Sequence, residues 1–343
     1  MPNQLLTAAI DGLASGRDLS QDEAAGVLAE IMNGGASDAQ IAAFLIALRT
    51  KGETVEEIAG LAQAMRELAT PVRTARVDLL DTAGSGGGRP SFNVSTTAAL
   101  IAAGAGCALA KHGNRSATGL SGSADLLEAL GARIDLGPEA VGRCIDEIGF
   151  GFMFAPAHHA ATRHVVPVRK ELAVRTIFNL LGPLTNPAGA RRQVVGVSDP
   201  AYLESLAGAL ARLGVERALV VSSEDGLDEM STSAPTHVVE VNGEAIERYV
   251  VAPEDAGLVT ADPAGIVGGT PQENAATTRA ILGGEPGPRR DLAVLNAGAA
   301  IYAGGRAASV REGVAAAQEA IDSGAALRTL DAYVARSREL AAA

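Results

Sequence analysis

The chain has 343 residues and a formal net charge of −12 at pH 7, with 47% hydrophobic, 20% charged and 3% aromatic residues. This length exceeds one ordinary compact domain and predicts two. The acidic balance argues against a general nucleic-acid binder, which needs a basic surface against phosphate. A small polyanionic ligand is still compatible with it, because a local cationic pocket or a metal can override the global field.

The sequence carries no visible targeting or membrane segment. Neither Cys107 nor Cys144 stands in a metal-type spacing, so we expect two free, buried thiols in a reducing compartment. The N-terminus lacks a basic region followed by an apolar core, which predicts no secretory signal. The apolar stretch 96–110 is interrupted by glycines and is too short to span a bilayer. We therefore expect a cytoplasmic protein.

Residues 1 to about 70 show the pattern of a small helical bundle. Candidate capping boxes, each a Ser or Thr followed three residues later by Glu or Gln, mark three helix starts: Ser20 with Glu23, Ser37 with Gln40, and Thr54 with Glu57. Asn33-Gly34-Gly35 and Lys51-Gly52 are typical helix ends. We predict a helical domain over residues 1–72, which helices from about residues 168–190 would join.

After Pro71 the sequence alternates between short apolar runs and helical stretches. The runs at residues 77–80, 107–110, 194–197 and 219–221 predict buried strands, and helices are expected from about Ser95 and from Ser123. This alternation predicts an α/β domain over residues 73–343, with a mostly parallel central sheet flanked by helices. Residues 292–340 are expected to be helical with glycine breaks. Residues 240–288 show little pattern beyond a hairpin near residues 241–243.

A glycine-rich segment, Asp81-Thr82-Ala83-Gly84-Ser85-Gly86-Gly87-Gly88, follows the first predicted strand. In open sheets ligands bind beyond the carboxyl ends of the strands, and glycines let several backbone N–H groups converge on a phosphate there. Ser95 and Thr96 add hydroxyls at the start of the next helix. A plain flexible turn is the alternative, since the segment matches neither the dinucleotide fingerprint nor the Lys-containing loop of nucleoside triphosphatases.

A basic segment, Lys111-His112-Gly113-Asn114-Arg115, follows the next predicted strand. A solvated charged turn is the alternative for this segment alone. Small apolar residues precede it, however, and residues 121–125 form a second helix start able to hold an anion. Two such helix starts beside a basic turn suit a ligand with two separated phosphate groups.

Taken together, these segments resemble the anthranilate phosphoribosyltransferases. Residues 84–96, 111–115, 121–125, the run RTIFNLLGPLTNP at 175–187 and Gly-Leu-Asp-Glu at 226–229 occur in the order found in that family. The resemblance covers nearly the whole chain, and the run at 175–187 is its most diagnostic part. It implies a homodimer with a small helical domain and a larger α/β domain, whose active site lies between them and acts in tryptophan biosynthesis. It also implies the substrates anthranilate and 5-phosphoribosyl 1-diphosphate, with Mg²⁺, and no nucleic-acid or membrane partner.

The resemblance also implies roles for residues at matching positions. Residues expected to hold the diphosphate sugar are Gly84, Gly86, Gly87, Gly88, Ser91, Asn93, Val94, Ser95, Thr96, Lys111, His112, Gly113, Asn114, Arg115, Ser116, Ala117, Thr118, Gly119 and Ser123. Residues expected around anthranilate are Gly84, His112, Asn114, Arg169, Gly182 and Pro183. Lys111, Asn114 and Arg169 are the expected catalytic residues, and the expected metal ligands are Ser95, Asp228 and Glu229.

The residue types suit these roles independently. Mg²⁺ prefers hard oxygen ligands and usually takes one or two carboxylates plus phosphate oxygens, which Asp228-Glu229 could supply from a loop after a strand. A solvated surface pair is the alternative. Arg169 offers a planar fork to the carboxylate of anthranilate, and the alternative is a structural ion pair with an acid such as Glu171.

The chain departs from the family pattern in the glycine-rich segment. The family has Gly-Thr-Gly-Gly-Asp-Gly, whereas here Ser85 replaces Thr, Gly88-Arg89 replaces Asp-Gly, and the loop is one residue shorter before Asn93. Serine keeps the hydroxyl. Loss of the aspartate predicts altered Mg²⁺ dependence or weaker binding of the diphosphate sugar. The family's His-Pro is His159-Ala160 here, and we expect a structural role for His159.

The expected reaction passes through a dissociative, oxocarbenium-like transition state, in which Mg²⁺ and Lys111 stabilise the leaving diphosphate. No strong general base is evident; His112 is one candidate and the carboxylate of anthranilate another. Two other functions compete. A pyrimidine nucleoside phosphorylase-like enzyme would not continue as Gly113-Asn114-Arg115 after the lysine, and a nucleic-acid-binding paralogue needs a basic groove that the net charge of −12 disfavours.

Overall fold

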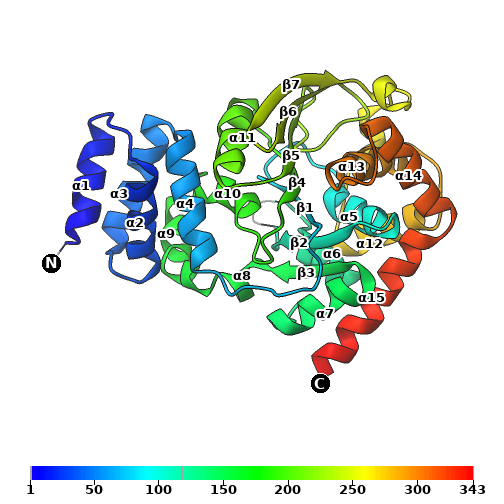
Figure 1. Cartoon of the computed structure of the whole chain (residues 1–343), viewed down its shortest axis with the longest axis horizontal. Helices are drawn as coiled ribbons and strands as arrows, with labels where there is room; N and C mark the ends of the chain where they lie inside the picture. The colour runs from blue at the N-terminus through cyan, green and yellow to red at the C-terminus, as the bar shows by residue number, and fades with distance from the viewer. Residues whose placement is uncertain (1, 117–118, 343) are drawn as a thin grey trace.

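The N-terminal part of the chain is a bundle of four helices. The computed structural model describes residues 2–116 and 119–342. Helices α1 (Gln4–Ala14), α2 (Gln21–Met32), α3 (Asp38–Lys51) and α4 (Val55–Glu67) form the bundle at the blue end of the chain in Figure 1. Each buries an apolar face against the others, which confirms the predicted helical unit.

Two of the three predicted capping boxes are present. The Ser20 and Thr54 side chains accept from the third backbone N–H of their helices, and the Glu23 and Glu57 carboxylates accept from the N–H groups of Ser20 and Thr54. At the start of α3 the prediction is half wrong. Ser37 caps the Gln40 N–H, but the Gln40 side chain binds the backbone of Asn3 at 3.0 and 3.1 Å instead. A tertiary contact between α1 and α3 has replaced the local one.

The remainder is built on one seven-stranded sheet in the order β3-β2-β1-β4-β5-β6-β7. The strands are β1 (Leu79–Gly84), β2 (Ala108–Gly113), β3 (Phe150–Phe154), β4 (Arg192–Gly196), β5 (Arg217–Ser223), β6 (Thr236–Asn242) and β7 (Ala245–Val251). The first five are parallel, and β6 and β7 are antiparallel. The mostly parallel sheet is therefore confirmed, as is the hairpin near residues 241–243, where Gly243 adopts φ 59°.

The boundaries of the first two strands differ from those predicted. β1 continues to Gly84 because Ala83 and Gly84 pair with β4, so half of the glycine-rich segment lies inside the sheet. β2 continues to Gly113, pairing Lys111 and His112 with Phe152 and Met153 of β3. The first residues of the predicted basic turn are thus a buried strand end, where the Lys111 side chain donates to Thr82 of β1 and the His112 ring binds the Gly182 carbonyl. Asn114 and Arg115 are exposed, as a turn predicts.

Helices cover both faces of the sheet (Figure 1). On one face, α5 (Val94–Gly104) and α13 (Pro288–Ala303) pack directly on the sheet. The other helices on this side are α6 (Ser123–Ala129), α7 (Pro138–Ile148), α12 (Pro271–Leu282), α14 (Val310–Asp322) and α15 (Ala325–Ala342). On the other face, α11 (Leu203–Arg212) packs on β5 and β6 and against α4 of the bundle. Short helices α8 (Ala155–His158), α9 (Val166–Leu172) and α10 (Phe178–Leu181) connect the bundle to the sheet. Single 3₁₀ turns span Ala160–His164, Gly182–Leu184, Pro200–Tyr202, Pro253–Ala256 and Pro263–Ile266.

The bundle and the sheet share an apolar core. Alternate residues of β5 point to opposite faces: Leu219 and Val221 belong to the core under α5 and α13, and Ala218 and Val220 to the core that also contains α1–α4. Side chains of residues 165–184 lie in this second core. The packing supports, as a proposal, the division into residues 1–72 plus helices near 168–190, and 73–343.

The strand order places a topological switch point between β1 and β4. β2 and β3 follow β1 on one side, and the chain then returns to add β4 and β5 on the other. The loops after β1 and β4 therefore diverge and leave a crevice at the carboxyl ends of the strands. Over the described residues, no helix combines the length and apolarity needed to cross a membrane. Cys107 and Cys144 are free and buried, as predicted.

Candidate active site

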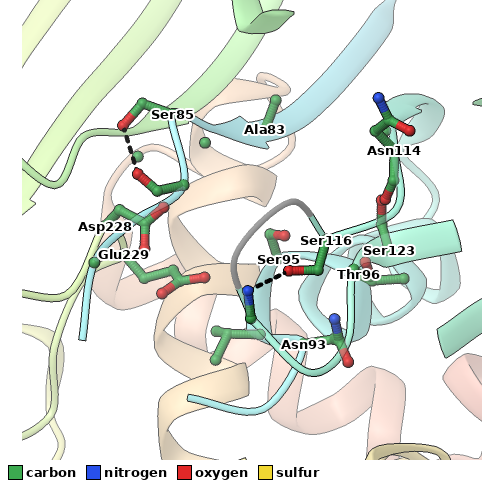
Figure 2. Close-up of a pocket in the computed structure, with 18 of the residues that line it drawn as sticks. Ala83, Ser85, Asn93, Ser95, Thr96, Asn114, Ser116, Ser123, Asp228 and Glu229 are labelled. Atoms are coloured by element: carbon green, nitrogen blue, oxygen red, sulfur yellow. Dashed lines mark hydrogen bonds between the residues drawn. The ribbon is translucent and has the colours of Figure 1, made fainter. Parts of the chain in front are cut away.

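One cavity of about 890 Å³ lies at this crevice. Its walls come from the ends of β1, β2, β4 and β5, the loop before α5, the loop between β2 and α6, the segment 169–183, and the loop between β5 and β6. Figure 2 shows Asp228 and Glu229 on one side of it, Asn114 and Ser123 on the other, and Ser95 and Thr96 between them. The structure brings together every predicted site residue that it describes; Ala117 and Thr118 lie outside the described residues.

The glycine loop is shaped by contacts that the sequence did not predict. Gly86 and Gly87 adopt φ 64° and 85°, which favours glycine. Arg175 donates from Nη1 to the Gly86 carbonyl at 2.9 Å and from Nη2 to the Ser85 carbonyl at 3.3 Å, and a Cβ on Gly87 would collide with it. On the other side, Ser198 donates to the Gly86 carbonyl at 3.1 Å and its N–H to Ser85 Oγ at 3.3 Å. The hydroxyl retained by Ser85 thus ties the loop to the end of β4.

Three glycines leave room for the carboxylate and backbone of Asp228. A Cβ on Gly84 would lie 3.0 Å from Asp228 Oδ2, and one on Gly88 would lie 2.6 Å from its Oδ1. A Cβ on Gly196, at the end of β4, would collide with the Asp228 backbone. At all three glycines the nearest atoms belong to the backbone or to the shielded carboxylate of Asp228. A larger residue at any of them would therefore displace Asp228. Gly88, at the position where the family has aspartate, lies directly against Asp228.

Arg89 links the glycine loop to the acidic loop. Its N–H donates to the Gly226 carbonyl at 2.8 Å, and its guanidinium to Asp225 Oδ2 and the Pro263 carbonyl, both at 3.1 Å. Gly88 stands where the family has the acid, and Arg89, where the family has glycine, links the two loops. The predicted change in Mg²⁺ dependence stays a prediction.

Lys111 is buried at the centre of the cavity floor. Its Nζ donates to the Thr82 carbonyl, to Thr82 Oγ1 at 3.2 Å and to Ser95 Oγ at 3.5 Å. Burial lowers the pKa of Lys111 to about 8, against the attraction of Asp81 and Glu229. A shielded cation between the glycine loop and the helix start of α5 is suited to an anionic ligand.

Asp81 holds the strand end that carries Lys111 and His112. It is fully buried and accepts from the His112 N–H at 3.1 Å and from Asn186 Nδ2 at 2.7 Å, and Asn186 also donates to the Ala110 carbonyl at 2.7 Å. Burial raises the pKa of Asp81 to about 6. The diagnostic Asn-Pro of the 175–187 run thus acts on β1 and β2 rather than on a ligand.

His112 is neutral, with one ring nitrogen left for a ligand. Nδ1 lies 3.1 Å from the Gly182 carbonyl, and since a carbonyl only accepts, Nδ1 carries the proton. Nε2 is shielded and has no hydrogen-bond partner among the described residues. Burial, aided by the nearby His159, lowers the pKa of His112 to about 3. The His159 ring lies 5.1 Å away between centroids and is itself buried, as a structural role would require.

Asp228 and Glu229 form the acidic wall, and their surroundings fit a hard divalent cation. Burial raises the pKa of both carboxyl groups, and the Asp228 charge raises that of Glu229 further. Glu229 Oε2 is shielded and has no partner among the described residues. With Ser95 Oγ on the facing wall, these oxygens form a donor set of the kind that Mg²⁺ takes, completed by ligand and water oxygens. No group of three or more His, Cys, Asp or Glu arranged for a metal occurs in 2–116 or 119–342.

Arg169, on α9, lies toward the bundle side of the cavity. Its guanidinium is 5.4 Å from the centre of the Phe178 ring, and Nη2 donates to Asn179 Oδ1 at 3.4 Å. Glu171 forms no ion pair with it within the described chain. Most of the fork is therefore available for a carboxylate.

Two predicted ligand residues already have protein partners. The Arg115 guanidinium binds Asp125 at 2.7 Å and Glu128 at 2.6 Å and lies over Phe154, so its charge is directed to the rim. Asn93 Nδ2 donates to the Ser121 carbonyl at 3.0 Å, and its Oδ1 accepts from Asn274 at 2.9 Å. Asn93 thereby joins the start of α5 to the loop between β2 and α6 and to α12.

Sequence reasoning missed Arg175, Ser198, Asn274 and Asn296, of which all but Ser198 line the cavity. Arg175 begins the diagnostic 175–187 run, which was a usable signal. The others are single polar residues in loops or inside helices, and only the folded chain brings them to the site.

Comparison with protein families defines the class first. A model described as "Glycosyl transferase family, a/b domain" matches residues 76–327, and one described as "Glycosyl transferase family, helical bundle domain" matches residues 7–69. The chain is thus a glycosyltransferase with a helical bundle and an α/β domain, as the sheet and its cavity indicate.

Individual relatives narrow the class. Proteins named anthranilate phosphoribosyltransferase from Symbiobacterium thermophilum and Rubrobacter xylanophilus are each 54% identical to this chain, over 95% and 98% of it and 96% and 99% of their own lengths. The crystal structure of the Thermus thermophilus enzyme superposes with a TM-score of 0.92 at 49% identity, covering 96% of this chain and 99% of that one. The Saccharomyces cerevisiae enzyme in complex with PRPP and Mg superposes with a TM-score of 0.89 at 28% identity, covering 97% and 98%.

The chain belongs to the anthranilate phosphoribosyltransferase family. The names of these relatives favour that transferase over the phosphorylase and nucleic-acid-binding alternatives.

Proposed function

We propose that this protein transfers the phosphoribosyl group of 5-phosphoribosyl 1-diphosphate to the amine of anthranilate, giving N-(5-phosphoribosyl)anthranilate and diphosphate in tryptophan biosynthesis. The observation that carries the proposal is the single cavity that joins the glycine loop, Lys111, the acidic pair and Arg169, in a chain 54% identical to enzymes of that name. Mg²⁺ is the cofactor, as in the Saccharomyces cerevisiae complex.

In the proposed arrangement the diphosphate lies between the glycine loop and the start of α5. Charge develops on it as its bond to the anomeric carbon breaks. Lys111 and the backbone N–H groups stabilise that charge where it forms, and they need no reorganisation because Thr82 and Arg175 already hold them. Ser95, Asp228 and Glu229 would hold Mg²⁺, which would supply positive charge against the diphosphate.

Anthranilate lies at the Arg169 side, where the guanidinium receives its carboxylate and Asn114, Gly182 and Pro183 form the walls. The arrangement brings the amine to the anomeric carbon from the side opposite to the diphosphate, which removes most of the entropic barrier to the encounter.

His112 accepts a hydrogen bond in this proposal rather than a proton. With a pKa of about 3 the ring is neutral at neutral pH, its one proton lies on Nδ1, and its shielded Nε2 offers a lone pair. A lone pair fixed in this way orients an N–H of the substrate amine. The proton then leaves late, to the anthranilate carboxylate or to water.

The test mixes purified protein with anthranilate, 5-phosphoribosyl 1-diphosphate and Mg²⁺ and follows the fall of anthranilate fluorescence. Controls omit each component in turn. If the protein is folded and the anthranilate fluorescence stays constant in the complete mixture, the proposed function is rejected.

We further propose a cytoplasmic homodimer that binds no nucleic acid. Leu5 of α1 and Ile46 of α3 are 42% and 37% exposed on two helices that pack together, which supports a contact through the bundle. The net charge of −12 supports the lack of nucleic-acid binding. Sedimentation equilibrium gives the stoichiometry, and Leu5→Glu with Ile46→Glu would shift a dimer to monomer if this face is used.

A further inference from the structure

The acidic pair stands on a loop without regular backbone pairing. Residues 224–235 connect β5 to β6, and Asp228 and Glu229 lie in the middle of this connection. Backbone hydrogen bonds at Gly226, Leu227 and Thr232 hold the two ends of this loop. Two polar side chains, Asp225 within the loop and Asn296 outside it, add contacts on either side of the acidic pair.

The first is Asp225, which holds the start of the loop. Its Oδ1 accepts from Ser223 Oγ at 2.6 Å, and its Oδ2 accepts from Ser231 Oγ at 2.8 Å and from Arg89 at 3.1 Å. This residue closes the loop on itself and joins it to the glycine loop.

The second is Asn296, in the middle of α13 and 5% exposed. Its Oδ1 accepts from the Met230 N–H at 3.0 Å, and its Nδ2 donates to the Met230 carbonyl at 2.9 Å. The amide therefore holds both peptide groups that flank Met230, the first of which is shared with Glu229. The Met230 side chain is fully buried on the core side, so Glu229 is turned the other way, to the cavity wall seen in Figure 2.

Only an amide side chain can make this set of contacts. The second N–H of Asn296 Nδ2 donates to the Leu292 carbonyl of its own helix at 2.9 Å, which prevents the amide from flipping. An aspartate would keep the acceptor and lose both donors, and a leucine would lose all three contacts at similar size.

We propose that Asn296 is a positioning residue for the magnesium site: by clamping the backbone of Met230 it holds Asp228 and Glu229 toward the diphosphate. This rests on the proposed function, since it assumes that the acidic pair binds the metal. Groups that orient metal ligands typically change metal affinity about 10- to 100-fold when they are removed.

The experiment measures direct binding of Mn²⁺, as a paramagnetic probe for Mg²⁺, by electron paramagnetic resonance in the presence of inorganic diphosphate. Asn296→Leu and Asn296→Asp are compared with the wild type. We expect the dissociation constant for Mn²⁺ to rise at least about tenfold in both variants. Saturating metal should restore much of kcat, and the KM for anthranilate should change less than about twofold, because Arg169 lies on another wall.

Ser337→Ala is the matched control. Like Asn296, Ser337 is a buried polar residue of a helix, in this case α15. Its Oγ accepts a hydrogen bond at 3.0 Å from the backbone N–H of Arg133, which lies outside the cavity. It should lower the melting temperature and leave Mn²⁺ binding unchanged.

Wild-type Mn²⁺ affinity in a folded Asn296→Leu protein would overturn the inference, and so would an equal loss of affinity in Ser337→Ala. If Asn296→Leu does not fold, Asn296→Asp decides by the same criteria. Failure of the wild type to consume anthranilate would instead reject the proposed function, so the two failures are distinguishable.

Discussion

At the proposed diphosphate end of the cavity the walls include closely packed backbone, whereas at the proposed anthranilate end Arg169 and Phe178 supply side-chain walls. The glycine loop, Gly196 and the acidic loop approach one another so closely that side chains would collide, and Arg175, Arg89 and Asn296 hold them from behind. At the other end, Arg169 and Phe178 project from short helices packed on the bundle. The shape of the first end therefore depends on the local backbone conformation of its loops. The shape of the second depends on how the bundle packs against the sheet.

The strongest test of this difference is Lys111→Met, which removes the buried cation at the diphosphate end. We expect kcat to fall about 10²- to 10³-fold, as for the loss of one preorganised electrostatic group, with little change in the KM for anthranilate. Steady-state kinetics with both substrates measures this. A variant that keeps kcat but loses anthranilate affinity would contradict the assignment of ends.

The buried His159, which lies against His112, predicts acid sensitivity of the fold. Burial, with the nearby His158, lowers the pKa of His159 from 6.5 to about 4. Between these values the unfolded chain binds more protons than the folded one, so stability is complete above pH 6.5 and declines as the pH falls toward 4. The loss from this group is at most about 3 kcal/mol.

Urea unfolding at pH 7 and pH 4.5 measures this decline, which His159→Asn should reduce. The control is His237→Asn, an exposed histidine on β6. An equal effect of both substitutions would show that burial of His159 is not the cause.

At the anthranilate end, Arg169→Ala should raise the KM for anthranilate roughly 10- to 100-fold, since hydrogen bonds to charged groups contribute about 1.5–3 kcal/mol. The KM for the diphosphate sugar should stay within about twofold. Lys170→Ala, an exposed neighbour in the same helix, is the control. If both KM values rise together, the two ends are not independent.

The smallest effect is expected from Gly88→Ala, which adds one methyl group beside Asp228. Because that methyl would lie 2.6 Å from Asp228 Oδ1, the carboxylate must shift, and we expect Mg²⁺ affinity to fall about tenfold, of the order of disturbing a ligand's support. Titration of activity with Mg²⁺ measures it. Gly137→Ala, at a position with open space around it, should change nothing.

Much of the site could be predicted because its motifs are local. Residues 84–96 and 111–115 lie in single segments next to strands, and the alternation of strands and helices predicts that these segments meet at one edge of the sheet. The boundaries were less predictable, because Lys111 and His112 look like turn residues until Thr82 and Asp81 of the adjacent strand satisfy them. Gln40 shows the same limit, since its partner lies in another helix.

By itself, the sequence predicted the helical bundle and the mostly parallel sheet, because hydrophobic period, capping residues and glycine turns act over a few residues. Its motifs predicted the family by resemblance, and with it the residues that line the cavity. Only the tertiary structure decided how those residues are held. Arg175, Arg89 and Asn296 contact backbone groups far away in the chain, and a lone polar residue carries no local signal of the distant peptide group that it will bind.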